Sequence, residues 1–119
     1  MRKSLVTLLA AFTLPTAVNA SVPYLYLNAG NMGKNESVNE CVEIATREMK
    51  IAGFTKIRES YLGENNKKQA TIVADHSWRP ATITYRCAED MKVYGWAISA
   101  IDNDDAYNSY KDMSNAFGK

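Results

Sequence analysis

Apolar and polar positions follow two different periods along this chain, and the change of period separates helix from sheet. Between residues 37 and 53, apolar side chains recur at three- and four-residue intervals, which is the spacing of one helix face. This face comprises Val38, Cys41, Val42, Ala45, Met49 and Ala52. Ser37 and Glu40 form a capping box that predicts the start of the helix, and Gly53 predicts a left-handed end.

From residue 54 onward the pattern is typical of β-strands. The predicted strands cover residues 54–62, 70–75, 81–87 and 91–101. The short turns between them indicate an antiparallel meander. The third strand alternates clearly, with Ile83, Tyr85 and Cys87 on one face, and Thr82, Thr84 and Arg86 on the other. A final helix is predicted to begin at Asp102 or Asp104 and to end at Gly118.

This order of elements predicts an α+β two-layer sandwich of helix, four strands and helix, with both helices packed on one face of the sheet. Residues 36–119 are interpreted as this single domain. Residues 21–35 form an N-terminal arm, either flexible or an edge strand. The short apolar run 24–27 follows Pro23, and a proline does not suit a central strand.

The first 20 residues have the features of a secretory signal peptide. Arg2 and Lys3 supply the positive start, an apolar run covers residues 5–14, and Val18 and Ala20 are the small residues at the cleavage site. The apolar run is shorter than the about 20 residues that span a bilayer. We therefore expect cleavage after Ala20, a periplasmic or secreted protein, and no membrane insertion once the leader is removed.

Charge changes the range of expected partners. Without the leader, twelve of the 14 basic residues remain against 13 acidic ones, so the net charge of the exported form is about −1. This balance provides no basic surface of the kind that nucleic acid requires. Nucleic acid is therefore not an expected partner.

The two cysteines, Cys41 and Cys87, are expected to form one disulfide, because an isolated pair in an oxidising compartment usually does. Two free thiols or a pair of metal ligands are the alternatives. Both fit less well, because the spacing is not that of a Cys-x-x-Cys motif and no histidine lies close to either cysteine in the sequence. If Cys87 points inward, the bond joins the first helix to the third predicted strand.

Motifs with known chemistry are incomplete in this sequence. Asp75, His76 and Ser77 are the residue types of a hydrolase triad, but neighbours on an extended strand point to opposite faces and cannot form the relay by themselves. The acidic run 102–105 fails as an EF-hand loop, because the required Gly and Glu are missing from its sixth and twelfth positions. We therefore expect no catalytic residue, no metal and no cofactor.

Aromatic and arginine side chains give the sequence its candidate interface. These residue types anchor protein–protein contacts. The candidates are Trp78, Arg79, Arg86, Tyr94 and Trp96. If Tyr94 and Trp96 face outward, they form a patch beside the row that contains Arg86; the alternative is that both are core residues under a helix. The last strand is apolar on both faces, so its pattern leaves this choice open.

Four short segments resemble small exported bacterial proteins without an assigned function. They are Glu40-Cys41 on the first helix, Gly53-Phe54 at its exit, Tyr85-Arg86-Cys87, and Asp104-Asp105-Ala106 at the start of the last helix. The likeness covers most of residues 36–118. It implies a periplasmic α+β domain with one disulfide and supplies no activity.

The function that these observations favour is a non-enzymatic periplasmic or secreted protein-interaction module, of which an immunity- or inhibitor-type protein is one form. Its partner would be a protein that the sequence does not identify. The alternative is a small-ligand or metal-binding protein that uses His76, expected at a surface or strand end, together with Asp75. An enzyme of unknown class is the third hypothesis.

Overall fold

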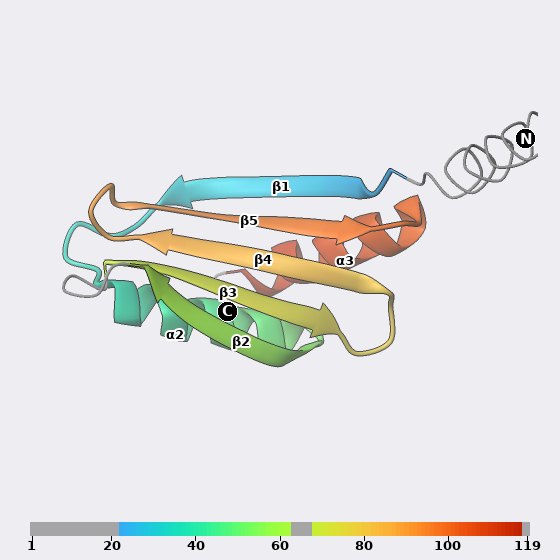
Figure 1. Ribbon diagram of the computed structural model, residues 1–119, viewed down its shortest axis with the longest axis horizontal. Helices are drawn as coiled ribbons and strands as arrows, with labels where there is room; N and C mark the ends of the chain where they lie inside the picture. Colours follow the sequence, from blue (N-terminus) through green and yellow to red (C-terminus); the bar gives the residue numbers. More distant parts are fainter. Residues whose placement is uncertain (1–21, 63–67, 118–119) are drawn as a thin grey trace, which may run out of the picture.

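The computed structural model describes residues 22–62 and 68–117 (Figure 1). The predicted signal peptide, the polar turn after residue 62 and the predicted stop at Gly118 lie outside the described residues. The described elements are β1 (Tyr24–Asn31), α2 (Val38–Ala52), β2 (Phe54–Leu62), β3 (Gln69–His76), β4 (Ala81–Ala88), β5 (Val93–Ala100) and α3 (Asn103–Ala116).

The strands form one antiparallel sheet in the order β1-β5-β4-β3-β2. The last four strands along the chain form the predicted meander, and β1 adds to its far side by pairing with β5. Both helices lie on one face of the sheet (Figure 1). The predicted α+β two-layer sandwich is confirmed, with five strands in the described residues rather than four.

The start of α2 is fixed by two side-chain hydrogen bonds and its end by a left-handed glycine. The backbone N–H of Glu40 donates to Ser37 Oγ at 3.1 Å, and the N–H of Val38 donates to Glu89 Oε1 at 2.7 Å. At the other end Gly53 adopts a φ of 98°, the left-handed conformation that glycine tolerates without a steric penalty. All six residues of the predicted apolar face are buried; the pattern did not indicate Glu48, which is buried beside them.

The core lies between the helices and the inward-facing residues of β3, β4 and β5. These strands alternate as a half-buried sheet should, and the predicted inward set Ile83, Tyr85 and Cys87 is buried. Other inward residues are Ala70, Ile72, Ala74, Trp96, Ile98 and Ala100. Several of these side chains are small, which lets the helices approach the sheet closely.

The disulfide joins the two layers. Cys41, in the first turns of α2, is bonded to Cys87 of β4, with 6.1 Å between the Cα atoms. Both side chains are buried, so the bond lies within the core. The predicted pairing is confirmed, and such a bond fits an extracellular setting.

The N-terminal arm is an edge strand over residues 24–31. Tyr26 anchors it: its hydroxyl donates to Asn103 Oδ1 at 2.7 Å, and its ring lies 5.6 Å from that of Tyr107 and 5.5 Å from that of Tyr110. These partners lie on α3, which begins at the cap residue Asp102. The strand is therefore held both by β5 and by a helix.

Removing the disulfide should lower the free energy of unfolding. In the Cys41→Ala/Cys87→Ala variant we expect a loss of up to about 4 kcal/mol, because the unfolded chain is no longer constrained by a loop of this length. Urea denaturation followed by circular dichroism measures the loss. The unsubstituted protein with and without reductant is the control, and equal urea midpoints in all three samples would contradict a stabilising disulfide.

Candidate functional site

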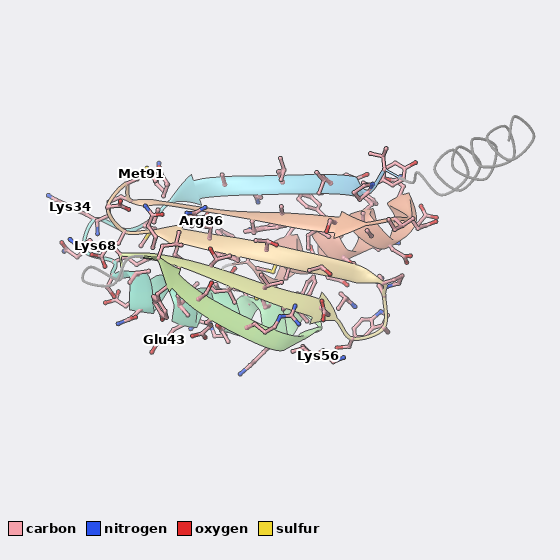
Figure 2. All side chains as sticks on the ribbon, in the orientation of Figure 1. Lys34, Glu43, Lys56, Lys68, Arg86 and Met91 are labelled. Carbon is pink, nitrogen blue, oxygen red and sulfur yellow. A yellow bond between two sulfur atoms is a disulfide. The ribbon has the colours of Figure 1, made fainter. Side chains whose placement is uncertain are left out.

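The face of the sheet opposite the helices is open, since none of the described elements covers it (Figure 2). Strand register assigns the outward side chains. On β1 and β5 they are Leu25, Leu27, Ala29, Asn31, Val93, Gly95, Ala97 and Ser99; on β3 and β4 they are mostly polar, including Gln69, Thr71, Asp75, Thr82, Thr84 and Arg86. The open face therefore has an apolar half and a polar half.

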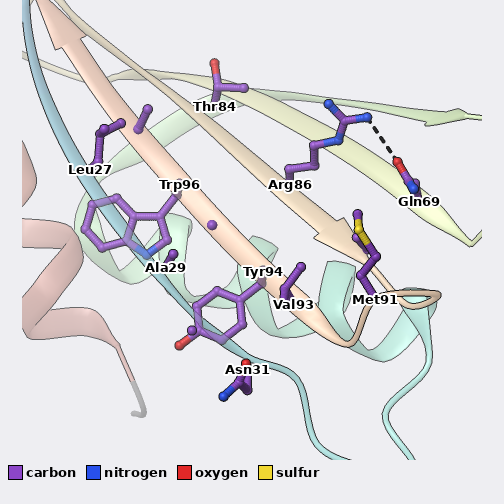
Figure 3. Close-up of a pocket in the computed structure, with 14 residues that line it drawn as sticks. Leu27, Ala29, Asn31, Gln69, Thr84, Arg86, Met91, Val93, Tyr94 and Trp96 are labelled. Carbon is purple, nitrogen blue, oxygen red and sulfur yellow. Dashed lines mark hydrogen bonds between the residues drawn. The ribbon is translucent and has the colours of Figure 1, made fainter.

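A shallow hollow of about 800 Å³ lies on this face at the boundary between the two halves (Figure 3). Its floor is made by Gly95, which lies opposite Ala29 of β1 on one side and Arg86 of β4 on the other. Because Gly95 has no side chain and Ala29 has a single methyl group, the surface dips there. Leu27 and Val93 border the hollow.

Charge enters the hollow at Arg86. Its guanidinium donates to Gln69 Oε1 at 3.0 Å (Figure 3). The amide nitrogen of Gln69 donates in turn to the Asp90 carboxylate at 3.0 Å. Arg86 is exposed, and Met91 lies at the same end of the sheet (Figure 2). The hollow therefore combines an apolar surface with one cation at its rim.

The polar half contains a hydrogen-bonded network farther along the sheet. The Asp75 carboxylate accepts from Arg58 at 3.3 Å and from Thr82 at 3.2 Å. The hydrogen bond from Arg58, together with its positive charge, holds the pKa of Asp75 below its ordinary value. Asp75 is therefore already engaged with neighbouring side chains of the sheet.

The sequence-derived interface residues do not form one patch. Trp78, 68% exposed, and Arg79 follow β3, at the end of the sheet away from the hollow. Trp96 is buried on the helix face, 5.3 Å from the ring of Tyr110. Tyr94 is also on the helix face, with its ring stacked between those of Tyr85 and Phe117 at 5.9 and 5.8 Å. Tyr94 and Trp96 therefore follow the core alternative.

Of the predicted set, Arg86, Tyr94 and Trp96 all contribute to the lining of the hollow, and Arg86 is the one of these three whose side chain lies on the open face. Sequence reasoning did not find the rest of the site. The sequence signal for it is Gly95 itself, since a glycine within a strand often marks a place where another group approaches the backbone closely.

His76 is enclosed at the end of β3. Its side chain is 0% exposed, its Nε2 lies 3.1 Å from Asp112 Oδ2, and Arg79 donates to the same carboxylate oxygen. The other ring nitrogen accepts from the N–H of Trp78 at 3.4 Å. The predicted strand-end position is correct, but the histidine is buried rather than at the surface. Both ring nitrogens are engaged by protein groups, so the ring presents no open position to a ligand.

The neighbours of His76 point elsewhere. Asp75 belongs to the open face, and the Ser77 hydroxyl donates to the carbonyl of Gly53 at 2.6 Å. The three adjacent residues therefore do not converge on one site, as expected from their positions on an extended strand. Within residues 22–62 and 68–117, no three His, Cys, Asp or Glu side chains gather closely enough to hold a metal ion.

None of the helices in the described part of the chain is long and apolar enough to cross a membrane. Comparisons with protein-family models, with curated proteins and with solved structures find no match to this chain.

Trp96 and Trp78 offer a matched test of the inward and outward positions. Trp96→Ala should lower the free energy of unfolding by about 3–5 kcal/mol, because it empties a core site between β5 and α3. Trp78→Ala should have a much smaller effect, since most of that side chain is exposed. Chemical denaturation compares the two, and similar losses would contradict the placement of Trp96.

Removing Asp112 should also destabilise the fold. Asp112→Ala leaves the buried Nε2 of His76 and the Arg79 guanidinium without their common acceptor, so we expect a loss of about 1–3 kcal/mol. Thermal unfolding measures the effect, with Asn108→Ala, an exposed position on the same helix, as the control. No difference between the two variants would show that the contact contributes nothing to stability.

Proposed function

We propose that this protein is an exported, non-enzymatic interaction module that binds another protein on the open face of its sheet, at the hollow over Gly95. The observation that carries the proposal is the apolar half of that face beside Arg86. The predicted signal peptide and the disulfide support an exported setting.

Exposure supports a binding role for this surface. Around the hollow Leu27 is 68% exposed, Met91 62% and Val93 38%. Contiguous apolar surface on a folded domain marks a site of interaction, because leaving it in water has a cost that burial against a partner removes. An arginine beside such a surface is a common feature of protein interfaces.

The shape and charge of the hollow suggest the chemistry of the partner. A single apolar or aromatic side chain could enter over Gly95, while a carboxylate or carbonyl group next to it could accept from Arg86. Binding rather than catalysis is further supported by His76, the one histidine of the sequence, whose ring is enclosed. An inhibitor of an enzyme in the same compartment is one form of this function.

Filling the hollow should abolish binding without unfolding the protein. In Gly95→Val the new Cβ would lie 3.4 Å from the nearest atom, the carbonyl oxygen of Asn28, so the strand can accept it. Valine also suits a strand better than glycine does. We expect the tagged exported protein to capture a partner from its own compartment, identified by mass spectrometry, and Gly95→Val to lose it.

The matched control is Thr71→Val, which replaces a hydroxyl with a methyl group on the polar half of the same face. It should capture the same partner as the unsubstituted protein. Capture of one protein by all three forms, or of none, would contradict binding at the hollow. If the captured protein is an enzyme, its inhibition by the unsubstituted protein and not by Gly95→Val would establish the inhibitor form.

A further inference from the structure

The two edges of the sheet are built differently. On the β2 edge the register against β3 shifts between Thr55 and Arg58, and Lys56 adopts a φ of 53° there. The charged residues Lys56, Arg58 and Glu59 follow this edge, with Lys56 visible beside β2 in Figure 2. Bulges and charges are the means by which proteins keep an edge strand from pairing with another chain. The eight residues of β1 pair with β5 without a register shift and include no charged side chain.

The polar backbone groups of alternate β1 residues face away from the sheet. Just beyond β1, the N–H of Met32 donates at 2.9 Å to a carbonyl that immediately precedes β5. In an antiparallel pair of strands, such hydrogen bonds recur at every second residue. The backbone N–H and C=O groups of the even-numbered residues of β1 therefore point toward β5. The backbone groups of Leu25 and Leu27 therefore face the open edge. Ala29 agrees with this assignment, because its N–H donates to the Asn28 side chain at 2.8 Å.

This edge is held in position for pairing. Tyr26 is anchored to α3 by its hydrogen bond to Asn103 and by two ring contacts. A strand that is already ordered loses little conformational entropy when another strand pairs with it. None of the described elements lies along its outer side (Figure 1).

A second copy of this chain is the partner that fits such an edge. In a two-fold antiparallel pairing, the same strand lies opposite itself, so a charged residue near the centre would meet a like charge. Residues 22–33 contain no charged side chain. The outward side chains Leu25 and Leu27 are 60% and 68% exposed, and the same pairing would bring the leucines of the two copies together.

We propose that β1 pairs antiparallel with β1 of a second copy about a two-fold axis at Leu27, so that two five-stranded sheets become one continuous sheet. Leu27 then lies opposite Leu27 of the second copy, and Leu25 lies opposite Ala29 of the second copy. In this pairing the N–H of Ala29 donates to the backbone of the second strand instead of to the Asn28 side chain. The two hollows over Gly95 lie on the same side of the joined sheet. Because one pair of strands makes a small interface, the dimer forms at high protein concentration and dissociates on dilution.

Placing a charge at the two-fold axis, by substitution of Leu27, tests the pairing. Sedimentation velocity over a concentration series should show the unsubstituted exported protein passing from monomer to dimer. Leu27→Lys and Leu27→Glu should each weaken self-association by roughly ten-fold or more, because two like charges face each other at the axis. An equimolar mixture of the two variants should restore the dimer, since Lys then faces Glu. A protein that stays monomeric at every concentration would overturn the proposal, as would a dimer that survives both substitutions.

Amide hydrogen exchange locates the contact within the strand. The N–H groups of Leu25 and Leu27 should exchange rapidly in dilute samples and slowly in concentrated ones. Those of Tyr26 and Asn28 should be protected in both, because they bond to β5 within one copy. Rapid exchange of the Leu25 and Leu27 amides in a concentrated, dimeric sample would place the contact elsewhere and overturn the proposal.

Three variants separate this dimer from the partner-binding hollow. Gly95→Val should self-associate as the unsubstituted protein does, because it leaves the β1 edge unchanged. Leu25→Pro removes an outward-facing N–H outside the hollow, so it should lose the dimer and keep the captured partner, while Leu25→Ala keeps the N–H and should retain more of the dimer. Failure of the dimer to form and failure of capture are thus observed in different variants.

Discussion

The structure depends on the packing of both helices against one face of the sheet. Ala45 of α2 and Ala106 of α3 are fully buried, as are Ala70 and Ala74 of β3, and these small side chains allow helix and strand backbones to come close. The disulfide fixes the position of α2 over β4 within this layer. The two helices form one layer, which buries the large inward side chains of the sheet. The opposite face has no such cover among the described elements, so it has to be compatible with water or with a partner.

The open face meets that condition in one half and departs from it in the other. An uncovered antiparallel face is normally polar, and the outward threonines of β3 and β4, with the Asp75–Arg58 pair, follow this rule. On β1 and β5 the outward residues are instead mainly leucine, valine, alanine and glycine, with Asn31 and Ser99 near the ends of the strands. Where an otherwise polar open face becomes apolar, a functional surface is expected. The charged, bulged edge at β2 strengthens the contrast with the uncharged edge at β1.

The sequence predicted the elements whose pattern is local. Helix α2 begins and ends at its predicted caps, the strand of residues 81–87 faces as predicted, and the disulfide is confirmed. Strand β5 was ambiguous because it is apolar on both faces, so that the inward positions of Tyr94 and Trp96 depend on strand register and on α3. The enclosure of His76 depends on Asp112, 36 residues away, and no local pattern indicates it. The hollow was missed for a related reason, because it arises where Gly95, Ala29 and Arg86 from three strands meet.

The position of β1 explains why the open surface and the open edge occur together. Strands β2 to β5 pair with their neighbours in the chain, whereas β1 pairs across almost the whole domain, with Tyr24 opposite Ala100. Its inward side contributes Tyr26 to the contact with α3, and its outward side contributes Leu25 and Leu27 to the open face. Because outward side chains of an edge strand have few packing partners, residues there can change with little effect on the core. The apolar half of the face is therefore the part of this fold in which binding can be altered at the smallest cost in stability, and β1 is the element through which both the face and the edge are adjusted.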